Sequence, residues 1–297
     1  MKSNALATVL ALTLFGAACS RSDQAVATAT PAKPEEKHYA LRGEVIAVDA
    51  AKKTLTVKHE AIEGYMPGMT MDFDVSTGDA AVAKPGQRIR AEMIPSATAN
   101  FRLEKIWPDD KVATDTVAAV ANALRQDTHN RGKEAYREIG EAMPDFALYD
   151  QEGRVVQSAR FRGKQIMLNF IYSRCPVANM CPASTAKMMQ VQKSAREAGV
   201  TNLELVSITL EPSYDSPGVL KDYAMARGID TTNFSFLTGP QAAIDDLFTQ
   251  FGVIAEFKST VPQHTLSTLL IDVNGKIAHR VDGSSWDPAE FVARMKK

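Results

Sequence analysis

The residues of this chain best suited to chemistry are two cysteines close together, Cys175 and Cys181. They follow a largely apolar run over residues 166–171 and precede a helical pattern, which predicts a loop between a buried strand and a helix. Functional sites of open α/β sheets form at this carboxyl end of the strands. A thiol pair in such a loop can carry electrons, hold a metal or close a structural bridge.

The spacing of the cysteines and their neighbours narrows this chemistry without deciding it. Five residues separate them, whereas ordinary dithiol motifs have about two, and the wider loop lets both thiolates converge on one ion. Pro182 suits the first turn of a helix, so Cys181 lies at or near the N-cap, where the helix dipole favours its thiolate. Arg174 adds positive charge. Because these features assist ligation and redox attack alike, a copper or zinc site, a redox dithiol and a simple disulfide stay open.

The segment from about residue 142 to the end resembles the Sco/SenC family of copper proteins. The matching stretches are PDFAL at 144–148, FRGK at 161–164, the cysteine loop with both Cys-Pro pairs, LTG at 237–239, and His264 ahead of LIDVNG at 270–275. The resemblance implies that Cys175, Cys181 and His264 bind copper. It also implies a role in building the dinuclear copper site of cytochrome c oxidase, although some members act as thiol–disulfide reductants.

Two positions depart from the family pattern. Members usually have three residues between the cysteines, where this chain has five, and Asp before the histidine, where this chain has Gln263. Three further histidines, His38, His129 and His279, have no comparable context, and we expect them to be structural or solvated.

A second group of soft ligands lies upstream. Met69 and Met71 are two residues apart in an alternating strand pattern, so their thioethers point to one face. Such methionines can simply fill a core. Met66 lies nearby, however, and His59 ends the preceding predicted strand. Thioethers with an imidazole are soft, neutral ligands, a set that suits Cu(I).

Residues 42–106 resemble the small periplasmic copper-binding domains of the CusF type. The match rests on KHEAI at 58–62 and MPGMTMDF at 66–73. The resemblance implies that His59, Met69 and Met71 bind Cu(I). In that family a tryptophan covers the ion, and Met66 stands at its position here, as a fourth ligand or a lid.

The elements that must position these residues fall into two classes. Short alternating strands separated by polar turns over residues 39–106 predict a small closed β-barrel of the OB type. Residues 107–141 read as a helical connector. From residue 142 to 297 strands alternate with helices and end in a hairpin at Asn274-Gly275, which predicts a thioredoxin-like α/β domain.

The N-terminus predicts export. Residues 1–18 have a basic start and an apolar core too short for a permanent transmembrane helix, as in a signal peptide. Residues 16–19 resemble a bacterial lipobox, in which Cys19 would carry the lipid; ordinary cleavage near Ala18 is the alternative. Residues 19–38 are polar and proline-containing, a flexible tether. We therefore expect a periplasmic protein that is lipid-anchored to a bacterial membrane.

These observations favour a copper metallochaperone over other functions. The net charge of −1 gives no reason to expect nucleic acid as a partner. The expected partner is a respiratory oxidase subunit with a copper site, or another periplasmic copper or thiol protein. The alternatives are a thiol–disulfide oxidoreductase that uses Cys175 and Cys181 as catalytic residues, and copper sequestration for tolerance.

Overall fold

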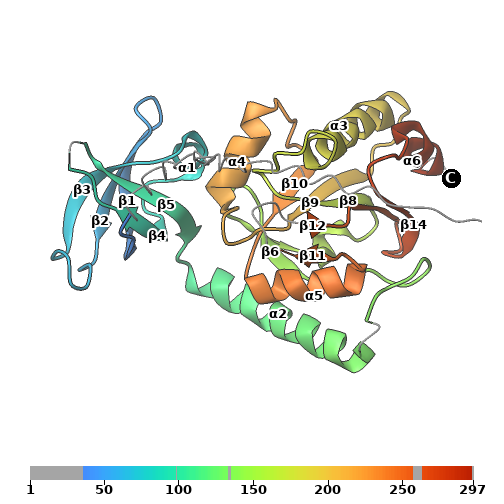
Figure 1. Cartoon of the computed structure of the whole chain (residues 1–297), viewed down its shortest axis with the longest axis horizontal. Coiled ribbons are helices and arrows are strands. Elements are labelled where there is room, and N and C mark those ends of the chain that lie inside the picture. Colours follow the sequence, from blue (N-terminus) through green and yellow to red (C-terminus); the bar gives the residue numbers. More distant parts are fainter. Residues whose placement is uncertain (1–35, 98, 133–134, 257–262, 296–297) are drawn as a thin grey trace, which may run out of the picture. The chain divides into compact units, whose positions relative to one another are not determined.

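The computed structural model describes residues 36–297, apart from residues 98, 133–134, 257–262 and 296–297. All the helices and strands below belong to the unit formed by residues 37–297 (Figure 1). The predicted signal peptide, the lipidation site Cys19 and nearly all of the tether lie outside the described residues. Among the described helices, none is long and apolar enough to cross a membrane.

Five strands form a closed barrel in the order β1-β2-β3-β5-β4, with β4 paired back to β1. They are β1 (Tyr39–Asp49), β2 (Thr54–His59), β3 (Met69–Asp74), β4 (Arg88–Ile94) and β5 (Phe101–Pro108). Alternate side chains fill the interior, where Leu55, Val57 and Phe73 are fully buried. This confirms the predicted all-β barrel of the OB type.

A short helix in the barrel was not predicted. This helix, α1 (Thr77–Val82), connects β3 to β4. The Ser76 hydroxyl caps it, accepting a hydrogen bond from the Asp79 amide at 3.0 Å. The six-residue length leaves only about one and a half turns, too few for helical periodicity to show in the sequence.

One long helix, α2 (Lys111–Arg131), follows the barrel. The Asp110 carboxylate caps it by accepting from the Ala113 amide at 2.8 Å. Val117 and Leu124 form its buried stripe, and the helix packs along α5 (Gln241–Phe251).

The remaining elements surround a five-stranded sheet in the order β10-β9-β8-β13-β14. Its parallel strands are β8 (Gln165–Ile171), β9 (Leu203–Thr209) and β10 (Phe234–Leu237), and its antiparallel strands are β13 (Ser267–Ile271) and β14 (Ile277–Asp282). Helices α3 (Cys181–Glu197) and α6 (Pro288–Met295) lie on one side of the sheet, and α5 with α2 lies on the other (Figure 1). This is the predicted thioredoxin-like α/β fold.

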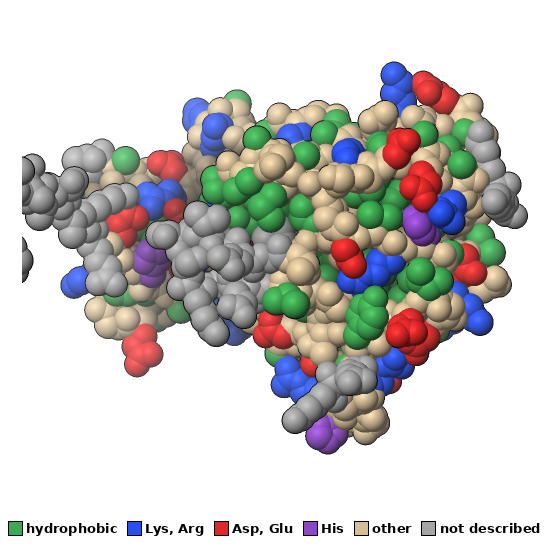
Figure 2. All heavy atoms as spheres, turned by 45° about the vertical axis from the view of Figure 1, so that its right-hand side comes forward, with side chains coloured by type: hydrophobic (Ala, Val, Ile, Leu, Met, Phe, Trp, Pro, Cys, Tyr) green, Lys and Arg blue, Asp and Glu red, His purple; other side chains and the backbone are tan. Residues whose placement is uncertain are grey.

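Smaller elements complete this part of the chain. They are the hairpin β6 (Ala147–Tyr149) and β7 (Val155–Gln157), the 3₁₀ turn η2 (Ser158–Phe161), the helix α4 (Pro217–Ala226), and the strand pair β11 (Ala255–Glu256) and β12 (Gln263–His264). Charged side chains of both signs are interspersed over the face shown in Figure 2, in keeping with a net charge of −1.

The sheet register determines which segments meet at the site. β8 and β9 are parallel, so the residues after Ile171 and after Thr209 leave the sheet at the same edge. β13 runs antiparallel to β8 and pairs Thr268 with Asn169, so the chain enters β13 at that edge too. Three segments therefore lie together at one edge of the sheet, the edge formed by the carboxyl ends of β8 and β9. They are the cysteine loop, the turn after β9 and the segment before β13.

Candidate metal centres

The cysteine loop, residues 172–181, connects β8 to α3. Cys181 is the first residue of α3, and its side chain is fully buried, whereas Cys175 is half-buried and packs against the same core. The Cys175 amide donates to the Tyr172 carbonyl oxygen at 3.3 Å, which folds the start of the loop back on itself. Both cysteines are free thiols.

The position of Cys181 at the start of the helix agrees with the sequence prediction, but the expected effect on its acidity does not. Burial, together with the adjacent Cys175 thiol, raises the pKa of Cys181, and the backbone hydrogen bonds at this position do not offset that effect. The thiol is therefore protonated at neutral pH and becomes a ligand or a nucleophile only when its proton leaves.

Arg174 does not supply the free positive charge that the sequence suggested. Its Nε donates to Glu211 Oε2 at 2.8 Å, a second guanidinium nitrogen also contacts this carboxylate, and the guanidinium carbon lies 4.5 Å from the ring centroid of Tyr214. The charge of Arg174 is thus compensated within the structure.

Tyr172 is a site residue that sequence reasoning missed. It is buried, and this burial raises the pKa of its hydroxyl, with a smaller contribution from a hydrogen bond with Cys175. A phenol that stays protonated can donate to the Cys175 sulfur. An aromatic residue at the end of a buried strand reads as core, so the sequence carried no signal of this contact.

His264 belongs to β12, where its backbone pairs with Ala255 of β11. β12 leads into β13 at the edge of the sheet from which the cysteine loop leaves. The structure therefore brings the backbone of His264 to the predicted edge. The side chain of His264 is outside the described part.

The upstream candidates gather at one mouth of the barrel. His59, the last residue of β2, lies directly opposite Met69 of β3, and Val57 lies opposite Met71. Opposite residues of an antiparallel pair share a face, and this face points inward, because Val57 is fully buried. His59 is 3% exposed, and its ring lies 5.9 Å from that of Phe73.

The two ring nitrogens of His59 have different surroundings. Nδ1 is 2.7 Å from the Glu60 carbonyl oxygen. A carbonyl only accepts, so Nδ1 carries the proton and Nε2 presents a lone pair. Nε2 is buried and has no hydrogen-bond partner among the described residues. A buried acceptor with no partner, on an imidazole oriented by its other nitrogen, is what a metal ligand requires.

The methionines complete this mouth. Met69 is 47% exposed, and Met66 and Met71 are half-buried against the barrel core. Met66 closes a tight turn with Ile62, whose amide donates to the Met66 carbonyl oxygen at 2.9 Å. Gly68 lets the chain pass close to His59, because a Cβ there would lie 3.0 Å from the His59 carbonyl oxygen. His59 and Met69 thus lie opposite each other on the β2–β3 pair, and Met71 lies two residues along the same face.

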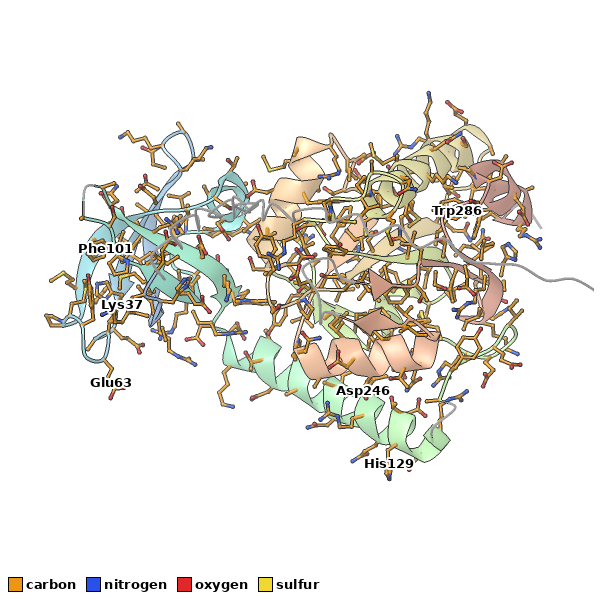
Figure 3. The ribbon with its side chains drawn as sticks, in the orientation of Figure 1. Lys37, Glu63, Phe101, His129, Asp246 and Trp286 are labelled. Carbon is orange, nitrogen blue, oxygen red and sulfur yellow. The ribbon has the colours of Figure 1, made fainter. Side chains whose placement is uncertain are left out.

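In the described ranges, no three His, Cys, Asp or Glu side chains form a metal-binding group by themselves. A metal site at the barrel mouth would therefore need methionine sulfur among its ligands. Of the remaining histidines, His38 contacts Glu92 with Nδ1 2.9 Å from Oε2, and His279 packs on Phe291. Figure 3 shows His129 near the end of α2, pointing away from the sheet.

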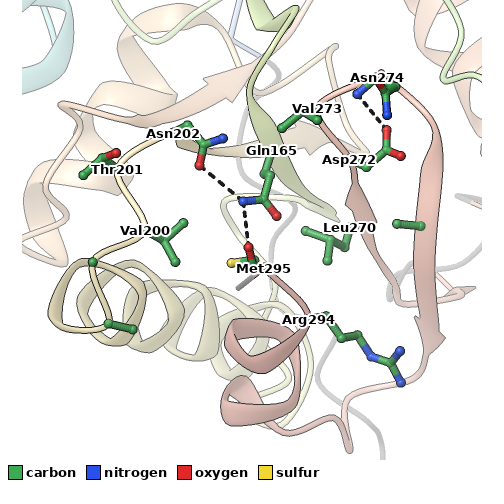
Figure 4. A pocket seen from close by; sticks show the side chains of 13 residues that line it. Gln165, Val200, Thr201, Asn202, Leu270, Asp272, Val273, Asn274, Arg294 and Met295 are labelled. Carbon is green, nitrogen blue, oxygen red and sulfur yellow. Dashed lines mark hydrogen bonds between the residues drawn. The ribbon is translucent and has the colours of Figure 1, made fainter. Parts of the chain in front are cut away.

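The edge of the sheet opposite the cysteine loop carries a pocket of about 690 Å³ (Figure 4). Gln165, the first residue of β8, donates from Nε2 to Asn202 Oδ1 at 3.3 Å and to the Met295 carbonyl oxygen at 3.1 Å. None of its described lining residues is a cysteine or a histidine. This pocket is separate from both candidate centres.

Comparison with protein families agrees with both resemblances. Residues 134–297, more than half of the chain, match the SCO1/SenC family model, and residues 38–108 match the model of the copper binding periplasmic protein CusF. A SCO2-like protein of Rickettsia conorii is 29% identical over 157 residues, which cover 50% of this chain and 74% of that protein.

Three solved structures that align with this chain have TM-scores below 0.5. A SCO1/SenC family lipoprotein from Bacillus anthracis aligns with a TM-score of 0.49 and 26% identity, over 54% of this chain and 97% of that one. BsSco, a member of the Sco family of cytochrome c oxidase assembly proteins with a disulfide switch, aligns with a TM-score of 0.48 and 22% identity, over 54% and 95%. Bradyrhizobium japonicum ScoI with copper bound gives 0.45 and 25%, over 52% and 98%.

Proposed function

Because the chain belongs to the SCO1/SenC family, we propose that it is a copper metallochaperone with two copper sites. Cys175 and Cys181, joined by His264, hold copper for transfer. His59, Met69 and Met71, with Met66 beside them, acquire or buffer Cu(I) at the barrel mouth. The family binds copper and takes part in cytochrome c oxidase assembly, which supports an oxidase copper-site subunit as the client.

The observation that carries this proposal is the unpartnered Nε2 of His59. A buried imidazole nitrogen without a hydrogen-bond partner costs free energy, about 1–3 kcal/mol, unless a ligand occupies it. It lies opposite a methionine, on a barrel that matches a copper-binding family. An imidazole and thioethers have no use in thiol exchange, so this site favours copper handling over redox chemistry alone.

The two sites suit different steps of the same task. Copper is the cargo, and the cysteine site offers two sulfurs that must each lose a proton to bind it. The barrel mouth offers thioethers that carry no proton, which gives weaker, neutral ligation suited to exchange. Transfer then proceeds by ligand exchange, in which each new bond to the cargo replaces an old one and no electron moves.

We place this protein in the periplasm, anchored by a lipid on Cys19 and held off the membrane by residues 19–38. The match to a periplasmic copper-binding family and the likeness to a SCO1/SenC lipoprotein support this placement. Mass spectrometry of the protein purified from membranes tests it. A mature N-terminus at Cys19 with added acyl mass is expected, and an unmodified N-terminus near Cys19 contradicts the anchor.

Titration of Cu(I) into the reduced protein tests the two sites. We expect two tightly bound ions per chain, one fewer in Cys175→Ser and one fewer in Met69→Ala. Met225→Ala is the matched control, because Met225 is also 47% exposed but lies on α4. Unchanged stoichiometry in both site variants would overturn the proposal.

One observation favours a second candidate, thiol–disulfide exchange. Cys175 packs against the core that contains Cys181, and both residues are free thiols. In that reaction the dithiol gives two electrons and two protons to a partner's disulfide, which becomes two thiols, while Cys175 and Cys181 form a disulfide. Full reductase activity in His264→Ala without copper would favour it. Sequestration for tolerance predicts instead a deletion strain with copper sensitivity and normal oxidase activity.

A further inference from the structure

The turn after β9, residues 210–216, is hydrogen-bonded to the cysteine loop through a fully buried carboxylate. Asp215 is 0% exposed. Its Oδ2 accepts from the Ser173 amide at 3.1 Å and from Thr209 Oγ1 at 2.6 Å, and its Oδ1 accepts from the Ser173 hydroxyl. Two of these three donors belong to the residue two positions before Cys175.

A second contact holds the next residue of the loop. Glu211, 8% exposed, accepts hydrogen bonds from Nε and one terminal nitrogen of the Arg174 guanidinium, which also lies over Tyr214. The Glu211 amide donates in turn to Thr209 Oγ1 at 2.9 Å. The Thr209 hydroxyl thus links the Asp215 carboxylate to the backbone of Glu211 at the end of β9.

These contacts hold the two residues before Cys175, which is the less constrained of the two cysteines. Cys181 is fixed by its place in α3 and by complete burial. Cys175 is half-buried, lies outside any helix or strand, and is joined to Cys181 by five residues. The distance between the two sulfurs depends on where residues 173 and 174 are held.

We propose that Asp215 and Glu211 are positioning residues of the cysteine site, which fix Ser173 and Arg174 so that the Cys175 sulfur stays within reach of Cys181. Neither carboxylate needs to touch the cargo. Because they already order the loop residues before Cys175, less conformational entropy is lost when the Cys175 sulfur binds or reacts. The effective concentration of one sulfur at the other is therefore higher. The part of this inference that concerns copper rests on the proposed function; the part that concerns the two sulfurs does not.

A glutathione equilibrium measures that effective concentration without copper. Protein dithiol and oxidised glutathione give protein disulfide and two molecules of reduced glutathione, and the equilibrium constant reports how readily the sulfurs meet. We expect this constant to fall about tenfold in Asp215→Ala. Ser173→Ala, which removes one donor from Asp215, should give a smaller fall in the same direction.

Glu204→Gln is the matched control. Glu204 is 6% exposed and ion-paired with Lys164, but lies at the opposite end of the same strand, β9. This variant should lose stability without changing the glutathione equilibrium. If Asp215→Ala does not fold, Ser173→Ala and Glu211→Gln carry the test. Wild-type equilibrium constants in these variants overturn the inference.

A copper arm separates this inference from the proposed function. In a His59→Ala background, which leaves the cysteine site alone, Asp215→Ala should weaken Cu(I) binding about tenfold at unchanged stoichiometry. If the background itself binds no copper, the proposed function fails while the glutathione result stands. If Cu(I) affinity and the glutathione equilibrium both stay at the background value, the positioning role fails while the proposed function stands.

Discussion

The two candidate centres are built in contrasting ways. At the barrel mouth, strand pairing places His59 opposite Met69, and the period of two places Met71 on the same face. At the sheet edge, the cysteine loop, the turn after β9 and the segment before β13 come from distant parts of the chain. The first centre is fixed by backbone register, and the second by side-chain hydrogen bonds between loops. Ligands on paired strands are positioned by the backbone pairing itself, whereas ligands on a loop need side-chain hydrogen bonds from neighbouring segments to position them.

The largest effect is expected from His59→Ala. Removing the imidazole should weaken Cu(I) binding at the barrel by more than about 100-fold, because loss of a direct ligand exceeds the 10- to 100-fold typical of its supporting contacts. Binding at the cysteine site should be unchanged. Competition with a chromogenic Cu(I) chelator measures both. His129→Ala on α2 serves as the control, and an equal loss in that variant would break the comparison.

Each region also holds a buried carboxyl whose pKa is raised, and these two carboxyls differ in their support. Asp79 has an oxygen with no hydrogen-bond partner among the described residues, and burial raises its pKa to about 7. Asp215 accepts three hydrogen bonds, and burial raises its pKa to about 6. The less supported carboxyl thus has the larger shift.

A raised carboxyl pKa gives a definite sign to the pH dependence. The folded state holds the proton of Asp79 up to pH of about 7, whereas the unfolded state loses it near 3.8. Its favourable contribution is therefore complete below pH 3.8 and is lost as pH rises to about 7, a change of about 4 kcal/mol. Urea unfolding of Asp79→Asn between pH 4.5 and 8 should show a flatter profile than the wild type. An unchanged slope contradicts the assignment.

A smaller, purely steric effect is expected from Gly43→Ala. Gly43 pairs with His59 in the β1–β2 ladder, and a Cβ there would lie 2.7 Å from the Lys58 carbonyl oxygen and 2.9 Å from His59 Cα. We expect a loss of about 1–3 kcal/mol in unfolding free energy. Barrel Cu(I) affinity should weaken as β2 moves, while the glutathione equilibrium of the cysteines stays constant. Denaturant titration measures the unfolding free energy, and the chelator assay measures the Cu(I) affinity of the barrel.

The smallest effect is expected from Tyr172→Phe. The change removes only the hydroxyl that contacts Cys175, worth about 0.5–1 kcal/mol, so the glutathione equilibrium should shift by about two- to fivefold. Barrel copper binding should not respond. An effect as large as that of Asp215→Ala would mean that the loop is held through Tyr172 rather than through the turn after β9.

The same contrast explains how much could be predicted from the sequence. Period-two alternation predicted the barrel and the shared face of Met69 and Met71, because strand geometry is local. The strand–helix alternation predicted the sheet, and Pro182 predicted the start of α3. The predicted direction of the Cys181 pKa shift was wrong, because the position of a residue in a helix can be predicted from the sequence and its depth of burial cannot.

The contacts around the cysteine loop were out of reach for a related reason. Ser173 and Asp215 are 42 residues apart and meet only because β8 and β9 are parallel neighbours. Asp215 by itself reads as an N-terminal feature of the following helix. The orphan Nε2 of His59 likewise depends on the ring turning toward Glu60, which no spacing rule reveals.

The sequence separation of the ligands has a consequence for the order in which the centres come apart. His59 and Met71 are 12 positions apart in the sequence, whereas Cys175 and His264 are 89 positions apart. By loop-closure entropy alone, bringing the more distant pair together costs about 2 kcal/mol more. This contribution alone favours a partly unfolded chain in which the barrel ligands stay assembled after the cysteine–histidine set has dispersed. Thermal or mechanical loosening of this protein would release cargo first from the centre proposed to deliver it.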